Sequence, residues 1–119
     1  MKLAGPFPSV KRVAYAITKN GRLLAQEFME ELDDREASKA LALFNLMDEA
    51  GVIKNKQKFN HIEDKIYEFK PTKQIRFGCF LWENCWLLTH GFKKKQRAWP
   101  FNQIIRAQKI RTECLEMLK

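Results

Sequence analysis

The fold is decided by residues 75–97, which read IRFGCFLWENCWLLTHGFKKKQR. Two apolar, aromatic-rich runs flank Glu83-Asn84, a pair suited to a tight reversal, and this arrangement predicts a β-hairpin. A single cation, Arg76, stands near the start of the first run. The second run ends in four cations, Lys93, Lys94, Lys95 and Arg97. We therefore expect a rigid β-platform that presents positive charge to a polyanion.

A further strand is expected at residues 66–70, joined to the hairpin by a three-residue turn at residues 71–73. In that register Lys70 pairs with Gln74, and Glu68 lies opposite Arg76. One face of the sheet is then apolar and forms the core side. It carries Tyr67, Phe69, Ile75, Phe77, Cys79, Leu81, Trp86, Leu88 and His90. The other face is expected to be open, and it carries Glu68, Lys70, Arg76, Leu87, Thr89 and Gly91.

The N-terminal half predicts one strand and two helices. Residues 12–18 alternate with period two, and residues 22–32 show an amphipathic helical pattern. A second helix is expected after Asp33, with Asp34 as its cap and without a full capping box, because Ala37 stands three residues later. Gly51 is its expected stop.

The lysine-rich residues 52–65 read as an irregular loop, and a last helix is expected to begin at Trp99-Pro100. The fold class is therefore α+β, with two N-terminal helices and a C-terminal helix packed on a small, mostly antiparallel sheet.

Length and composition limit the classes of protein that fit. With 119 residues the chain is expected to form one domain, residues 1–119. No apolar run approaches the ~20 residues of a membrane span, and the N-terminus lacks the apolar segment of a signal peptide. Cys79, Cys85 and Cys114 are expected to be reduced, packed thiols. His61 and His90 are far apart, so we see no metal site and no cofactor motif. These features predict a cytoplasmic protein.

Positive charge is concentrated in the second half of the chain. The net charge is +8, and residues 1–50 contain 7 Lys and Arg against 8 Asp and Glu. Residues 51–119 contain 15 Lys and Arg against 6 Asp and Glu. Such a distribution favours phosphate-rich partners, although a solvated basic face without a specific ligand is the alternative.

No nucleophilic triad, paired-carboxylate site or Gly-rich phosphate loop is visible. Cations on the open face could still promote RNA cleavage, because the 2′-hydroxyl of RNA is itself the nucleophile. Arg76 suits such a site, since a planar guanidinium holds two phosphate oxygens in fixed geometry. Other interpretations stay open. Arg76 with Glu68 can be a plain cross-strand ion pair, His90 a packed histidine, residues 93–95 a solvated strand end, and Trp82 a core residue rather than a base-stacking platform.

Several segments resemble the phage-derived, HigB-like branch of the RelE/ParE toxin superfamily. Residues 67–70, YEFK, resemble its Tyr-Glu-Leu-Arg strand, and residues 75–77, IRF, resemble its Tyr-Arg-hydrophobic strand. Residues 88–95, LTHGFKKK, resemble its Leu-Leu-His-Gly-Phe-x-Lys-Lys signature, which is the most specific of these motifs. Pro100 before the last helix also fits, and the similarity spans nearly the whole chain.

The resemblance implies a RelE-like fold and a toxin paired with a helix-turn-helix antitoxin. It implies cleavage of mRNA on the ribosome without metal or cofactor. By motif position, the expected catalytic residues are Arg76, Lys70 and His90, with Arg76 stabilising the transition state. RNA binding is expected from Lys58, Lys93, Lys94, Lys95 and Arg97.

The chain departs from the family pattern in two ways that concern chemistry. A lysine stands at Lys70 where the family has arginine, and no tyrosine follows Tyr67, so a C-terminal tyrosine acid is missing. A ParE-like inhibitor of DNA gyrase and an inactive RNA- or antitoxin-binding module are the alternatives.

Overall fold

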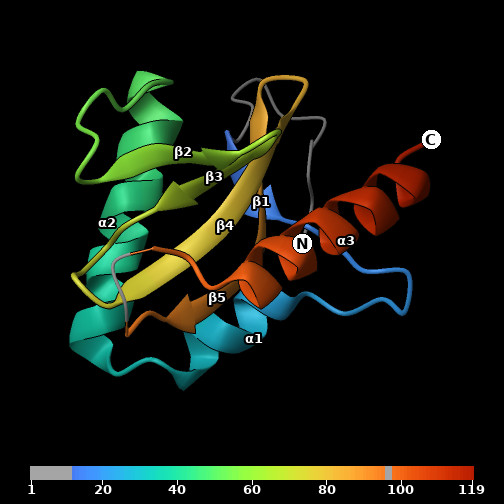
Figure 1. Ribbon diagram of the computed structural model, residues 1–119. Coiled ribbons are helices and arrows are strands. Elements are labelled where there is room, and N and C mark those ends of the chain that lie inside the picture. Colours follow the sequence, from blue (N-terminus) through green and yellow to red (C-terminus); the bar gives the residue numbers. More distant parts are fainter. Residues whose placement is uncertain (1–11, 96–97) are drawn as a thin grey trace.

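The computed structural model describes residues 12–95 and 98–119, and these form three helices and one five-stranded sheet (Figure 1). The helices are α1 (Leu24–Glu31), α2 (Asp34–Ala50) and α3 (Phe101–Met117). The strands are β1 (Val13–Tyr15), β2 (Phe59–Glu63), β3 (Ile66–Phe69), β4 (Ile75–Trp82) and β5 (Cys85–Lys93).

The sheet has the order β1-β5-β4-β3-β2. Strand β1 runs parallel to β5, and all other pairs are antiparallel. These findings confirm the α+β class, the two N-terminal helices, the C-terminal helix and the mostly antiparallel sheet. That the fold is RelE-like stays a prediction.

The expected hairpin is confirmed. Trp82 pairs with Cys85 and Leu81 with Trp86, so Glu83-Asn84 forms a two-residue turn. Glu83 takes a positive φ of 47°, which is the backbone conformation that such tight turns require.

The turn between β3 and β4 is longer than we expected. Phe69 pairs with Phe77 and Glu68 with Gly78, so the register differs by two residues from the expected one. Glu68 therefore lies diagonal to Arg76 and not opposite it. The faces of both strands are unchanged, because side chains alternate with a period of two residues.

A β-bulge in β5 changes the faces expected beyond Leu88. Cys79 pairs with Leu88 and Phe77 with Gly91, so two residues, Thr89 and His90, oppose Gly78. The extra residue shifts the alternation by one. Gly91 consequently faces α1, where a Cβ would overlap the ring of Phe28, and not the open face. His90 bonds to α3 and not to the core side under α1 and α2.

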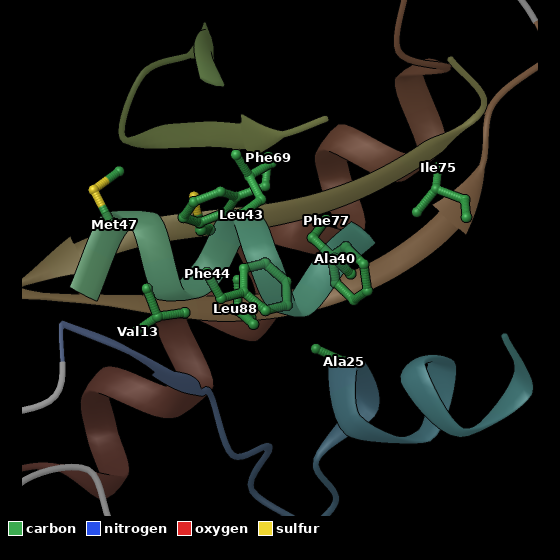
Figure 2. Close-up of a cluster of buried hydrophobic side chains, with 11 residues drawn as sticks. Val13, Ala25, Ala40, Leu43, Phe44, Met47, Phe69, Ile75, Phe77 and Leu88 are labelled. Atoms are coloured by element: carbon green, nitrogen blue, oxygen red, sulfur yellow. The ribbon is translucent and has the colours of Figure 1, made fainter. Parts of the chain in front are cut away.

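The sheet is covered on both faces. One core cluster, shown in Figure 2, joins α1 and α2 to the sheet through Ala25, Leu43, Phe44, Phe77 and Leu88 among others. A second cluster joins α3 to the opposite face and includes Phe80, Leu87, Ala107, Ile110 and Cys114. The expectation of an open face is therefore wrong. Figure 1 shows α3 lying across the sheet on the side away from α2.

Two local expectations about the first half also change. The cap of α2 is Asp33, and it forms a full capping box with Glu36, whose side chain accepts from the Asp33 backbone N–H. Strand β2 occupies part of the segment expected to be an irregular loop. A two-residue reversal joins β2 to β3, with Asp64 at a φ of 51°. Gly51 ends α2 at a φ of 78°, as expected.

Cys79, Cys85 and Cys114 are free and buried. In the part of the chain that the structure describes, no helix has the length and apolar character to cross a bilayer.

Candidate nucleic-acid interface

An open cleft of about 960 Å³ lies between the start of α2 and the segment that joins β3 to β4. Among the residues that the structure describes, six cationic side chains line it against two carboxylates, so this lining carries an excess of positive charge. The cations are Arg35, Lys39, Lys58, Lys70, Lys73 and Arg76, and the carboxylates are Asp33 and Glu36. A concave surface lined by one sign of charge raises the local concentration of oppositely charged ligands. The cleft is therefore the natural seat for a polyanion.

Arg76 lines this cleft although only 7% of its surface is exposed. Its Nη1 donates to the backbone oxygens of Thr72, at 2.7 Å, and Ile75, at 2.8 Å. Its Nε lies 3.2 Å from Glu68 Oε1, a charge contact without the alignment of a hydrogen bond. Burial lowers the pKa of Arg76, and the nearby Glu68 carboxylate opposes this effect. The guanidinium is thus held rigidly at the cleft wall.

Lys70 and Lys58 lie beside Arg76 in the cleft. Lys70 Nζ donates to the backbone oxygen of Lys56 at 3.0 Å and lies 3.6 Å from Glu68 Oε2. The Lys70 backbone N–H donates to the Lys58 oxygen at 2.8 Å, which fixes the two residues side by side. The structure therefore brings together three of the residues expected from the sequence.

The cationic residues at the end of β5 and just after it lie in two different environments. Lys93 is exposed, and its Nζ lies 3.5 Å from Glu36 of α2. Lys94 is half-buried, and its backbone N–H donates to the oxygen of the cleft residue Gln74 at 2.6 Å. Burial and the nearby charges of Arg76 and Lys70 lower the pKa of Lys94, while Glu68 raises it. Lys95 is exposed, and Arg97 lies outside the described residues.

His90 lies apart from the described lining of the cleft. It is 1% exposed, with Nδ1 bonded to Thr89 Oγ1 at 3.1 Å and Nε2 bonded to Gln103 Oε1 of α3 at 2.8 Å. Burial lowers its pKa to about 4, so the ring is neutral near pH 7. These contacts fit the interpretation of His90 as a packed, hydrogen-bonded histidine. A role for His90 in proton transfer stays a prediction.

Lys73 lines the cleft although it was not expected from the sequence as a site residue, and two further groups of residues were also not expected. Arg35 and Lys39 stand four apart on α2, on one helix face, and both line the cleft. Their spacing of four residues indicates a shared helix face. We did not expect a cationic site there because the helix is rich in acidic residues. Trp99 is the second case, since its indole Nε1–H donates to Glu68 Oε1 at 2.8 Å. No local sequence pattern predicts this contact, because 31 residues separate Trp99 from Glu68.

The described part of the chain contains no candidate metal site. Within residues 12–95 and 98–119, no three His, Cys, Asp or Glu side chains are arranged to hold a metal ion. We take the cleft, which is concave and positively charged, as the candidate functional site.

Comparison with known proteins gives one finding of similarity. No curated protein matches the sequence. Among protein families, the phage-derived Gp49-like proteins (DUF891) match residues 27–112, from α1 to the last turns of α3. The matched segment contains the cleft and all the cations that line it. By this match over most of its length, the chain belongs to the phage-derived Gp49-like family.

Proposed function

We propose that this protein is the toxin of a toxin–antitoxin pair and that it cleaves mRNA on the ribosome. The observation that carries the proposal is the cleft, in which Arg76 is fixed beside Lys58 and Lys70. Lys94 lies near enough for the charges of Arg76 and Lys70 to lower its pKa. The Gp49-like family supports it, because the family is of a RelE-like, toxin-like type. The proposal includes membership of the HigB-like branch. It also includes two partners, the ribosome and a helix-turn-helix antitoxin.

Arg76 is suited to stabilise the transition state of RNA cleavage. In that reaction the 2′-hydroxyl gives its proton to solvent water as its oxygen bonds to phosphorus. The bond to the 5′-oxygen breaks, that oxygen takes up a proton, and negative charge grows on the phosphoryl oxygens on the way. Arg76 Nη1 donates to two backbone oxygens, and Nε makes a charge contact with Glu68. No hydrogen bond to Nη2 is formed by the described residues. Nη2 is then the group that can bind the phosphate. A donor held in advance costs no reorganisation during the reaction.

Lys94 is suited to transfer a proton. Its pKa is lowered, so its ammonium group gives up a proton more readily than that of an ordinary lysine. Its place beside Gln74 puts it at the cleft, whereas His90 is buried under α3. We assign to Lys94 the donation of a proton to the leaving 5′-oxygen.

The test is Arg76→Lys, which keeps the charge and removes the planar fork. We expect cleavage to fall by about 10²-fold or more, comparable to the loss of one preorganised donor. The measurement is primer extension on mRNA from induced cells and on purified ribosomes, with the melting temperature of the same variant. Arg76 is buried, so the unfolding transition must be recorded for every activity value. Full cleavage by a folded Arg76→Lys protein would contradict the catalytic role.

RNA binding without cleavage is the second candidate function. It is favoured by the burial of Arg76 and by the absence of a histidine from the described lining of the cleft. Protection of bound RNA without strand breaks would support it. Intact transcripts together with blocked supercoiling by gyrase would point instead to a gyrase inhibitor.

A further inference from the structure

A buried carboxylate stands behind the cleft. Glu68 is 3% exposed, and three groups from different parts of the chain converge on it. Trp99 Nε1 and Arg76 Nε lie 2.8 Å and 3.2 Å from Oε1, and Lys70 Nζ lies 3.6 Å from Oε2. A buried charge needs both a counter-charge and hydrogen bonds to be tolerated. Arg76 supplies the counter-charge, and among the described groups the well-aligned hydrogen bond comes from Trp99.

The indole of Trp99 packs closely against residues of β4 and β5. Trp99 is 7% exposed and meets the ring of Phe92 edge to face at 4.8 Å. It also covers Gly78 of β4, where a Cβ would stand 2.9 Å from the indole Cη2. Any side chain at Gly78 would therefore displace the indole. Since Glu68 pairs with Gly78 across the sheet, this glycine opens the path from the indole to the carboxylate.

Trp99 reaches Glu68 from the segment just before α3, which begins at Phe101. The contact thus ties the start of the C-terminal helix to the carboxylate that faces Arg76. Without the indole N–H, Oε1 loses its aligned donor, and the carboxylate is free to turn toward Lys70. Arg76 would then keep the carbonyl contacts of Nη1 but lose the charge contact between Nε and Glu68.

We propose that Trp99 and Glu68 are positioning residues for Arg76. The indole N–H fixes the carboxylate, and the carboxylate fixes the guanidinium so that Nη2 points into the cleft. This inference rests on the proposed function where it concerns cleavage, because Arg76 is the residue that meets the phosphate. Its purely structural part, the immobilisation of Arg76 by Trp99, can be measured without any RNA.

The test is Trp99→Phe, which keeps an aromatic ring at this position and removes the N–H. In wild-type protein, the Arg76 Nε–H signal in nitrogen-15 NMR is expected to be resolved from those of exposed arginines. In Trp99→Phe it should move to the position of the exposed arginines. We expect cleavage to slow by about 10- to 100-fold, because a small misplacement of a catalytic group has effects of this size. In the Arg76→Lys background, Trp99→Phe should change cleavage by less than about twofold, since residues that act as a unit are not additive.

Trp82→Phe is the matched control. Trp82 packs against the same core cluster, but its indole makes no hydrogen bond within the described residues. The Trp82→Phe substitution should leave the Arg76 Nε–H signal and the cleavage rate unchanged. If Trp99→Phe does not fold, Glu68→Gln replaces it, because the amide can still accept from the indole but no longer carries the charge that attracts Arg76. We expect the same shift of the Arg76 signal.

The outcomes separate this inference from the proposed function. An unchanged Arg76 signal in both Trp99→Phe and Glu68→Gln would overturn the positioning role. So would an equal loss of cleavage by Trp99→Phe in the wild-type and Arg76→Lys backgrounds. A wild-type protein that cuts no RNA would overturn the proposed function alone, because the NMR comparison would still decide whether Trp99 and Glu68 hold Arg76.

Discussion

Arg76 is a buried cation at the wall of the cleft, and it lies 3.2 Å from the buried carboxylate of Glu68. The alternation in β4 placed Arg76 opposite the apolar residues, and the structure agrees. Arg76 is 7% exposed, and it contacts the backbone oxygens of Thr72 and Ile75 and the carboxylate of Glu68. Trp99 reaches that carboxylate from a distant part of the chain. An exposed pair with Glu68 would contribute only about 0.2–1 kcal/mol, whereas breaking a buried pair costs about 3–5 kcal/mol. The role of Arg76 therefore has to be separated from its contribution to folding.

At His90 we predict a loss of stability in mild acid. Its pKa is about 4 in the folded protein and about 6.5 when unfolded, so folding favours the neutral ring. The stabilisation is full above about pH 6.5 and is lost as the pH falls toward 4. The difference amounts to about 3 kcal/mol at most.

The measurement is the free energy of unfolding in urea across this pH range, for wild type and His90→Gln. The glutamine does not titrate, so it removes this part of the pH dependence while carboxylates elsewhere contribute equally to both proteins. Parallel curves for the two proteins would show that His90 is not buried in its neutral form.

At the level of elements, the N-terminus of α2 serves two purposes that a pair of substitutions can separate. Asp33 caps the helix and also lines the cationic cleft. Asp33→Ala should cost about 1 kcal/mol of stability and strengthen the binding of single-stranded RNA, because a repulsive carboxylate is removed. Asp33→Asn should strengthen binding without the loss of stability, since asparagine caps a helix as well as aspartate does.

Urea unfolding and fluorescence titration with a labelled RNA measure the two effects. RNA affinity that is unchanged in both variants would place the bound RNA away from α2. A loss of stability in Asp33→Asn as large as that in Asp33→Ala would contradict the capping role.

The packing of α1 on β5 depends on the bulge at Thr89-His90. The bulge turns Gly91 toward α1, and a Cβ there would overlap the ring of Phe28, which meets Phe77 edge to face at 5.4 Å. Gly91→Ala should destabilise the protein by about 1–3 kcal/mol through overpacking. Phe28→Leu in the same chain should recover part of that loss, and thermal unfolding of both variants measures it. An unaffected Gly91→Ala protein would mean that α1 can move away from β5 without cost.

The elements that were predicted correctly are those with strong periodicity or clear termination signals. The hairpin of β4 and β5, the stripes of the three helices and the stop at Gly51 follow from local sequence. Strand β2 was missed because lysines and a short alternation conceal it. The bulge was missed because nothing in residues 89–90 shows that both oppose Gly78 until the partner strand is in place. Register is a property of two strands, and one strand's sequence does not determine it.

At the scale of the whole molecule, the sequence located the charge but not the cavity that collects it. The excess of cations after residue 50 is visible in the sequence, whereas Arg35 and Lys39 join them only when α2 packs beside the turn between β3 and β4. Three expected residues, Arg76, Lys70 and Lys58, do line one cleft. Their convergence depends on tertiary structure, which brings the end of β3 and the start of α2 together.

The salt dependence of RNA binding tests whether the cationic run after β5 belongs to this site. Each phosphate neutralised on a single strand contributes about −0.7 to the slope of log K against log salt concentration. Lys94 lies at the cleft edge beside Gln74, and Lys95 follows it. Replacing both with alanine should therefore weaken binding and make the slope shallower by about 1.4 if each contacts one phosphate.

A control must remove the same charge from elsewhere on the molecule. Lys65 lies in the reversal between β2 and β3, at the opposite end of β3 from the cleft, and Lys109 is exposed on α3. Replacing these two with alanine lowers the net charge equally but should leave the slope within about 0.3 of wild type, because counterion release counts contacts and not total charge. Equal changes in the two double variants would mean that the field of the whole protein attracts RNA and that the run after β5 makes no phosphate contact of its own. A shallower slope in Lys94→Ala/Lys95→Ala alone would place the RNA backbone along the edge of the cleft where β5 ends, next to the guanidinium of Arg76.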